Sequence, residues 1–439
     1  MTVSGARTGV VGGAVPEGGA VLSTVAMKAL GPLSGDVLEA GAGATLDEIS
    51  RLLERDPDGP RMFYPPDPTE TTASIGGTIA TDASGSSSYL YGSTRRWILW
   101  VELALADGSL LRLERGDWGF DDDGLCRHPS LGEIRLPAPR PRLAKDAAGL
   151  WMRQGMDLVD LVVGSEGTLG VVTRAGLRLR ETPGHVVDSI WFLPGMEELW
   201  ELFDTFRRSP SRVRALELMD DAALDFLRNH PVEDVPPPPG GAGTAALLAR
   251  VEAAEDASLD AALEEAEGFV ERLSLPEGMV WIGLEPGERK KLRSFRHALP
   301  ESANREISRR RLAVPGIHKL GSDSAVPVDS IREYYTALRR LLEESGLEHL
   351  VFGHLGEGHP HANLLPASAN DLARGESVMV EIARLAVRMG GTVSAEHGLG
   401  RMKSSLAGIA FSNEEREAMR LVRRAFDPEA LLGPCMEWA

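Results

Sequence analysis

Three glycine-rich segments in the first 170 residues constrain the fold more than any other feature of the sequence. They lie at residues 4–13, 74–85 and 164–170. A glycine has no Cβ, so the backbone can approach a flat ligand closely and several N–H groups can converge on an anion. None of the three is the Gly-Lys-Ser/Thr loop of a nucleoside-triphosphate site, and each one alone is equally typical of an ordinary turn. Their order along the chain predicts a first domain built around an extended ligand.

The hydrophobic pattern changes near residue 183 and divides the chain. Before this point, short apolar runs predict strands, and a capping box at Thr45 and Glu48 predicts the start of one helix. After it, long amphipathic stretches alternate with strand-like pieces, which predicts helices packed on an antiparallel sheet. The predicted domains are 1–182, 183–410 and 411–439, and the predicted helices are 46–55, 196–208, 256–273, 330–345, 376–389 and 413–426.

Composition excludes several classes of protein. A chain of 439 residues suits two or three packed domains, and a net charge of −18 argues against nucleic-acid binding. Two cysteines, Cys126 and Cys435, are too few for a disulfide framework or an iron–sulfur cluster. The sequence has no signal peptide and no apolar run of membrane-spanning length. We therefore expect a cytoplasmic protein, either free or peripheral to the inner face of the membrane.

Four histidines near the chain end lie in two glycine-punctuated motifs, of which the first is Gly353–His361. A two-residue turn at Glu357–Gly358 predicts a hairpin in which His354 opposes His361. Opposed side chains lie roughly 4.5–5.5 Å apart on one face of a hairpin, so the two imidazoles can share a metal ion. His359 lies on the same face and is either a third ligand or a neighbour. The alternative is a polar hairpin with unrelated surface histidines.

The second motif, Ser394–Gly400, places Glu396 and His397 side by side. A carboxylate completes a metal site with two imidazoles, and Glu396 is the candidate. His397 is the candidate general base, because the pKa of a histidine lies near the working pH of most enzymes. Together the two motifs predict an active site.

Six segments spread over the whole chain form a combination that is specific to one family. They are Pro65–Asp67, Ser74–Gly77, Gly164–Gly170, Ser322–Pro327, Gly353–His361 and Ser394–Gly400. On these segments the chain resembles the FAD-linked oxidases of the vanillyl-alcohol oxidase (PCMH) type, in the branch of D-lactate dehydrogenase, glycolate oxidase and D-2-hydroxyglutarate dehydrogenase. The resemblance implies an α+β fold: a PCMH-type FAD-binding domain, here without its usual first βαβ unit, and an α+β substrate or cap domain with an antiparallel sheet and a C-terminal helical segment.

The resemblance also implies where FAD binds. Residues 4–13 would hold the pyrophosphate, and Thr8 stands where some relatives carry a flavin-linking histidine, so we expect non-covalent FAD. The implied cofactor-binding residues are Ser4, Gly5, Arg7, Thr8, Gly9, Gly12, Gly13, Pro65, Pro66, Asp67, Ser74, Ile75, Gly76, Gly77, Ile79, Ala80, Ala83, Gly85, Gly92, Glu166, Gly167, Gly170 and Val171.

Within this family resemblance the expected reaction is oxidation of a 2-hydroxy acid to the 2-oxo acid. A divalent zinc, manganese or iron ion held by His354, His361 and Glu396 would bind the substrate hydroxyl, His397 would take its proton, and hydride would pass to the flavin. The expected substrate contacts are Arg296, Lys319 and His359, with Arg296 favoured because arginine binds carboxylates in bidentate fashion. Electrons would leave to a separate acceptor, which is a quinone, an electron-transfer protein or oxygen. A homodimer is the oligomeric state that we consider.

Two other interpretations stay open on sequence alone. The family's usual Asp-Gly-Asn-Xaa-His reads Glu357-Gly-His-Pro-His361 here, and the front end of the cofactor domain is short, so the chain could be a non-catalytic or decayed FAD-fold paralogue. A metal-dependent hydrolase could use the same histidines and Glu396 without redox chemistry. The presence or absence of a flavin spectrum in the purified protein separates the hydrolase from the other two.

Overall fold

The computed structural model describes residues 1–55, 61–137, 140, 143–209, 211–253, 264 and 267–433. The chain forms two compact units. The first unit comprises residues 1–182 together with 392–439, and the second comprises residues 183–391. The predicted domains divide at 183 and at 411, whereas residues 392–410 lie in the first unit together with residues 411–439.

Backbone hydrogen bonds of residues 392–401 explain why this segment belongs to the first unit. The Ala147 N–H donates to the Ser394 carbonyl at 2.9 Å, and the Arg401 N–H donates to the Val11 carbonyl at 3.0 Å. These bonds join the Glu396-His397 motif to the first unit. A sequence pattern reports local periodicity and not such long-range pairing, so these two contacts could not be predicted from the sequence.

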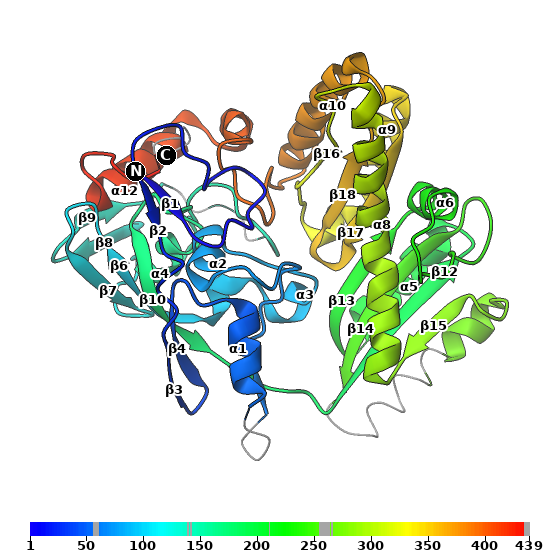
Figure 1. The fold of residues 1–439 in the computed structure, drawn as a ribbon, viewed down its shortest axis with the longest axis horizontal. Coiled ribbons are helices and arrows are strands. Elements are labelled where there is room, and N and C mark those ends of the chain that lie inside the picture. Colours follow the sequence, from blue (N-terminus) through cyan, green and yellow to red (C-terminus); the bar gives the residue numbers. More distant parts are fainter. Residues whose placement is uncertain are drawn as a thin grey trace. The chain divides into compact units, whose positions relative to one another are not determined.

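A five-stranded antiparallel sheet forms the centre of the first unit (Figure 1). In β4 the side chains of Leu38 and Ala40 are fully buried while Val37 and Glu39 are partly exposed, as expected for a strand with one face on the core. Gly176 of β10 is required because a Cβ there would lie 2.1 Å from Trp100 Nε1 on the adjacent strand. The strands, in sheet order, are β3 (Leu30–Ser34), β4 (Val37–Gly41), β10 (Val171–Arg178), β6 (Ile98–Ala104) and β7 (Leu110–Glu114).

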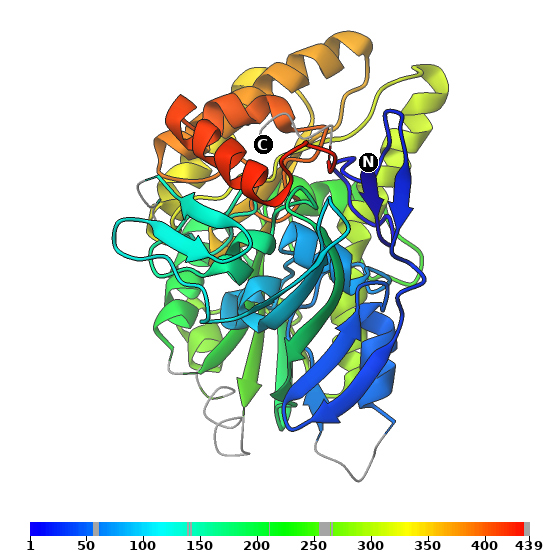
Figure 2. The same ribbon diagram turned by 90° about the vertical axis from the view of Figure 1, so that its left-hand side faces the viewer.

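Helices and short ribbons surround this sheet, and Figure 2 shows α12 beside the hairpin of β8 and β9. The predicted capping box is confirmed: Glu48 N–H donates to Thr45 Oγ1 at 3.2 Å, and Thr45 N–H donates to Glu48 Oε2 at 2.9 Å. The other elements are β1 (Thr2–Ser4), β2 (Val21–Ser23), β5 (Met62–Phe63), β8 (Leu125–His128), β9 (Gly132–Arg135), β11 (Arg180–Glu181), α1 (Leu46–Leu53), α2 (Ile75–Thr81), α3 (Ser88–Tyr91), η1 (Thr94–Trp97), α4 (Leu158–Val162), η4 (Ser404–Leu406), α11 (Ala407–Ala410) and α12 (Asn413–Phe426).

The second unit contains a seven-stranded sheet whose neighbouring strands are all antiparallel, as predicted. Strands β12 and β14 are buried almost throughout, and the charges that they contain are paired, with Arg250 Nε 2.6 Å from Asp188 Oδ1. The strands, in sheet order, are β15 (Val280–Gly283), β12 (His185–Leu193), β14 (Ala245–Ala253), β13 (Arg212–Met219), β17 (His349–His354), β18 (His359–Leu364) and β16 (Leu320–Gly321).

Most predicted helices of the second unit are present, but its longest helix was missed. Figure 1 shows α8 running along the sheet, where it contacts β12 and β15. Pro300 lies inside α8, and proline removes a helical hydrogen bond, so the sequence argued against a helix there. The predicted helix 256–273 lies partly outside the described residues, and its residues 267–273 are helical. The helices are α5 (Met196–Arg208), α6 (Asp221–Asn229), α8 (Pro286–Ala313), η2 (Val328–Ser330), α9 (Ile331–Ser345), η3 (Leu355–Glu357) and α10 (Ala369–Arg388).

The described residues contain no candidate for a membrane-spanning helix. None of their helices combines the length and the apolar character needed to cross a bilayer.

Candidate active site

A cavity of about 330 Å³ opens in the first unit, and all three glycine segments contribute to its wall. Its volume is within the range of small-molecule sites, about 300–1,000 Å³. Glu396 and His397 also line it, although the cofactor prediction did not include them. The predicted cofactor residues in the wall are Gly5, Arg7, Thr8, Gly9, Gly13, Ser74, Gly76, Gly77, Ala80, Ala83, Glu166, Gly167 and Gly170.

The remaining predicted cofactor residues support this wall or lie beside it. Asp67 Oδ1 accepts a hydrogen bond from Ser87 N–H at 3.0 Å, and a Cβ on Gly85 would lie 2.0 Å from the Asp67 carbonyl oxygen. Ile75 and Ile79, which belong to α2, are fully buried. The predicted residues outside the wall are Ser4, Gly12, Pro65, Pro66, Asp67, Ile75, Ile79, Gly85, Gly92 and Val171.

The backbone shapes the cavity for a flat, anionic ligand. The Ala6 N–H donates to Ser74 Oγ at 3.2 Å, and a Cβ on Gly5 would lie 2.5 Å from that same oxygen. Gly76 lets α2 pack closely on the sheet, because a Cβ there would lie 2.8 Å from the Ala42 Cβ. Side chains at these positions would push the neighbouring segments apart, so the wall of the cavity requires glycine there.

Glu166 connects the third glycine segment to the Glu396-His397 motif. Its carboxylate accepts hydrogen bonds from the Leu399 N–H at 2.9 Å and the Gly400 N–H at 2.7 Å. Burial raises the pKa of Glu166 to about 7, although these two N–H donors oppose the rise. Gly398, with φ of +77°, is needed beside it because a Cβ would lie 2.9 Å from the Glu166 carboxyl carbon. Glu166 therefore fixes the motif loop against the cavity.

Titration of Glu166 is expected to make the stability of the protein depend on pH. Its folded pKa of about 7 lies above the ordinary 4.5, so the stability it contributes is full below 4.5 and is lost as the pH rises through 7. The upper bound of this loss is about 3 kcal/mol, reduced by solvent in the cavity. In chemical denaturation from pH 5 to 8, Glu166→Gln should gain stability relative to the wild type as the pH rises. The exposed Glu54→Gln is the control, and parallel curves for Glu166→Gln and the wild type would contradict the expectation.

Glu396 lies in a polar environment that the sequence did not reveal. The ammonium of Lys145, whose side chain is fully buried, is 3.1 Å from Glu396 Oε2 and 3.3 Å from the Gly85 carbonyl oxygen. His397 Nε2 is 3.6 Å from the other carboxylate oxygen, Oε1, and the His397 side chain is 36% exposed. A buried ammonium at this distance compensates the charge of the carboxylate and fixes its orientation. The partly exposed imidazole next to it is accessible for proton transfer.

The histidine hairpin is present in the second unit, but its predicted register was wrong. His354 pairs with His359, and Phe352 pairs with His361. The turn contains the 3₁₀ turn η3 and then Gly358, with φ of +69°, where a Cβ would lie 2.1 Å from the Val326 carbonyl oxygen. The partner of His354 therefore moves by two residues. An even shift keeps every side chain on its predicted face, so all three histidines still share one face.

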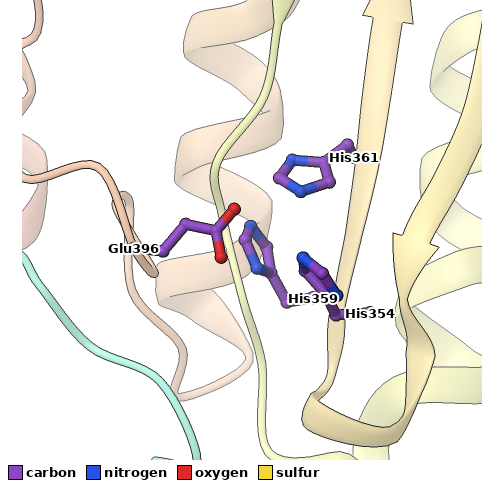
Figure 3. Close-up of side chains that lie close together, drawn as sticks. All are labelled: His354, His359, His361 and Glu396. Atoms are coloured by element: carbon purple, nitrogen blue, oxygen red, sulfur yellow. The ribbon is translucent and has the colours of Figure 1, made fainter. Parts of the chain in front are cut away.

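Figure 3 shows the three imidazoles beside one another on this hairpin. Ring centroids are 5.7 Å apart for His354 and His359, 5.6 Å for His354 and His361, and 4.2 Å for His359 and His361. One nitrogen from each ring lies within 4.8 Å of the others. Neutral imidazole nitrogens at this separation suit zinc, copper, iron or nickel, so the donor set fits a transition metal.

An oxygen atom outside the hairpin lies near each imidazole. His361 Nδ1 is 3.0 Å from the Ser322 carbonyl oxygen, and His359 Nε2 is 3.1 Å from Asp323 Oδ1. His354 Nδ1 is 3.4 Å from Glu217 Oε1. Such acceptors fix the tautomer and the orientation of metal-binding histidines.

Arg296, predicted to contact the substrate, pairs with Glu217 through Nε at 2.6 Å. Burial raises the pKa of Glu217, but Arg296 and the contact with His354 outweigh burial and hold it well below its usual value. Glu217 thus stays ionised behind His354. Lys319, the other predicted cation, is half-buried just before β16, and burial lowers its pKa.

Sequence reasoning gave no site role to Glu217. It noted Lys145 only within the segment 145–149, which was expected to face the flavin, and Asp323 only within the segment 322–327. Glu217 had a usable signal, because it is a single acid inside the apolar run Ala215–Met219. A charge within a buried strand needs a partner and so marks a candidate site. Lys145 and Asp323 lie in irregular segments, where no periodicity separates a buried charge from an exposed one.

Comparison with protein families agrees with this division of the chain. Residues 1–114 match a family model described as FAD binding domain, and residues 182–436 match one described as FAD linked oxidases, C-terminal domain. These matches confirm the resemblance and the α+β fold class, and they support FAD as the cofactor.

Curated relatives match over nearly the whole chain. The D-lactate dehydrogenase of Archaeoglobus fulgidus is 29% identical, over 98% of this chain and 84% of the relative. The D-2-hydroxyglutarate dehydrogenase of Xanthomonas citri pv. viticola is 27% identical over 98% and 82%, and the glycolate oxidase subunit GlcD of Bacillus subtilis is 26% identical over 98% and 82%. A solved alkyldihydroxyacetonephosphate synthase shares the fold, with a TM-score of 0.61 at 13% identity over 98% of this chain and 72% of that chain.

Proposed function

The chain belongs to the FAD-linked oxidases, and from this we propose that it oxidises a 2-hydroxy acid to the corresponding 2-oxo acid with the help of a divalent metal. Lactate, 2-hydroxyglutarate and glycolate, named in three of its relatives, share a hydroxyl beside a carboxylate. The observation that carries the proposal is the lining of the glycine-rich cavity by Glu396 and His397. An acid and an imidazole at the wall of a flavin cavity supply what this reaction needs besides the flavin.

FAD, when bound, supplies the redox chemistry by accepting the hydrogen and electron pair from C2 of the substrate. The glycine-rich wall residues of the first unit would hold it, and residues 4–13 would hold its pyrophosphate. Thr8 stands where some relatives carry a flavin-linking histidine, so non-covalent FAD remains part of the proposal.

The metal, when bound, lowers the pKa of the substrate hydroxyl and orients the substrate. We assign it to His354 and His361 of the second unit and Glu396 of the first, with zinc, manganese or iron as candidates. Lys145 keeps Glu396 charged and oriented for this role.

His397 takes the hydroxyl proton in our proposal. Its exposed ring borders the cavity, and a general base must reach the hydroxyl proton directly or through one water. Lys319 and Arg296 are the candidates to bind the substrate carboxylate, and the engagement of Arg296 with Glu217 favours Lys319. The electrons then leave to a quinone, an electron-transfer protein or oxygen.

An anaerobic titration tests this function. The purified protein should be yellow, and its flavin absorbance should bleach on addition of one member of a panel containing D- and L-lactate, D- and L-2-hydroxyglutarate and glycolate. Binding of the carboxylate and hydroxyl together predicts that the corresponding 2-deoxy acid, propionate for lactate, causes no bleaching. A flavin-loaded, metal-loaded protein that no 2-hydroxy acid reduces would refute the proposal, and a colourless protein with hydrolytic activity would favour a metal hydrolase.

A further inference from the structure

We infer that His359 is a third imidazole ligand of the metal, oriented by Asp323, so that the hairpin presents three histidines to the ion and favours zinc over manganese. This inference rests on the proposed function, since it concerns the same metal. It adds a ligand and a positioning residue, and it predicts which metal the site selects.

The position of His359 in the hairpin is the first argument. It lies directly opposite His354 in the ladder of β17 and β18, and its side chain is fully buried. Opposed residues of an antiparallel pair project from the same face, and His361 follows two positions later on that face. The ring of His359 is therefore inside the cluster, with its centroid 4.2 Å from that of His361 and 5.7 Å from that of His354.

The contact with Asp323 is the second argument. Its carboxylate is 1% exposed and lies 3.1 Å from His359 Nε2. A carboxylate that accepts the proton of one ring nitrogen leaves the lone pair of the other nitrogen, Nδ1, as a ligand, and it makes that nitrogen more basic. This is the same arrangement that Glu217 provides for His354 and that the Ser322 carbonyl provides for His361.

A purely structural pairing of His359 with Asp323 would add little to the attachment of residues 322–326. Two other contacts already join this segment to the hairpin: Ser322 N–H donates to the Ala362 carbonyl at 2.8 Å, and Val326 N–H donates to the Gly358 carbonyl at 3.0 Å. Burying an ionisable pair costs free energy that these backbone bonds do not require. A role for the ring nitrogen at the metal accounts for the buried pair.

Metal selectivity follows from the donor set. Imidazole nitrogen suits zinc and cobalt, whereas manganese and magnesium prefer carboxylate, carbonyl and water oxygen. Each imidazole added to the site therefore increases the preference for zinc. Three imidazoles and one carboxylate predict that the protein retains zinc from a mixture of zinc and manganese.

The test uses FAD-loaded full-length protein and the metals alone. Wild type, His359→Asn, Asp323→Asn and His349→Asn are stripped, equilibrated with equal zinc and manganese, and assayed for bound metal. His349 is the matched control, because it lies at the other end of β17 and contacts the Leu347 carbonyl oxygen at 2.9 Å. We expect zinc affinity to fall about tenfold or more in His359→Asn and in Asp323→Asn, the range known for outer-shell partners, with manganese affinity little changed. In cobalt-loaded protein, the visible absorption should shift in His359→Asn and should stay unchanged in His349→Asn.

The outcomes separate this inference from the proposed function. A wild type that binds neither metal would refute the proposed metal site itself. A wild type that binds zinc, with unchanged affinity, selectivity and cobalt spectrum in His359→Asn, would overturn only the inference. Circular dichroism and FAD content report whether His359→Asn is folded. If it is not, Asp323→Asn decides, and unchanged zinc affinity in that variant overturns the inference.

Discussion

Replacing His397 with alanine is expected to slow reduction of the flavin by the substrate at least a hundredfold. A positioned general base contributes about 10²–10⁴-fold to a proton-transfer step, and His397 is the imidazole that lines the flavin cavity. FAD should remain bound, because the wall of the cavity consists mainly of the three glycine-rich segments and not of His397. Anaerobic stopped-flow measurement of flavin bleaching at saturating substrate gives the rate directly.

The control for His397 is His318→Ala, a half-buried histidine of the second unit whose Nδ1 is 3.3 Å from the Gly316 carbonyl oxygen. It should reduce at the wild-type rate. If His397 acts as the base, raising the pH should partly restore the variant, since hydroxide or deprotonated substrate then replaces the base. Near-normal reduction in His397→Ala at neutral pH would remove this residue from the mechanism.

The fold was predictable where short-range signals agree with one another. Helices α5, α9 and α12 begin and end close to their predicted bounds, because an apolar stripe and charged flanks mark each of them. Helix α8 was not predicted, since Pro300 and a dense run of arginines obscure its stripe. Its stripe is nevertheless real, with Phe295, Leu299 and Ala303 all fully buried at helical spacing. Tertiary packing, not propensity, stabilises it.

The shared face of the three histidines was predictable, but their long-range partners were not. The period of two places all three histidines on one face whatever the turn, which is why an error in register left the cluster intact. The register itself depends on the close approach of Gly358 to the Val326 carbonyl, a contact between segments far apart in sequence. Glu217 and Asp323 likewise reach the histidines only through the folded sheet. Such partners cannot be found from spacing along a single motif.

Replacing Glu396 with glutamine is expected to abolish turnover and also to destabilise the first unit. Turnover should fall because the proposed metal loses its carboxylate, and treatment of the wild type with a chelator should have the same effect, reversed by zinc. Stability should fall because the buried ammonium of Lys145 loses its counter-charge, which costs up to about 3–5 kcal/mol for a buried pair. Chemical denaturation and steady-state assays measure the two effects separately.

The double variant Glu396→Gln with Lys145→Met distinguishes the two roles of the carboxylate. Removing both charges leaves no unpaired ion, so much of the lost stability should return. Turnover should not return, because neither glutamine nor methionine supplies the anionic ligand. A double variant that recovers both stability and turnover would show that Glu396 only neutralises Lys145, and full activity of chelated wild type would refute the metal itself. Recovery of stability alone would assign Glu396 both functions: a partner for Lys145 within the first unit and a ligand in the reaction.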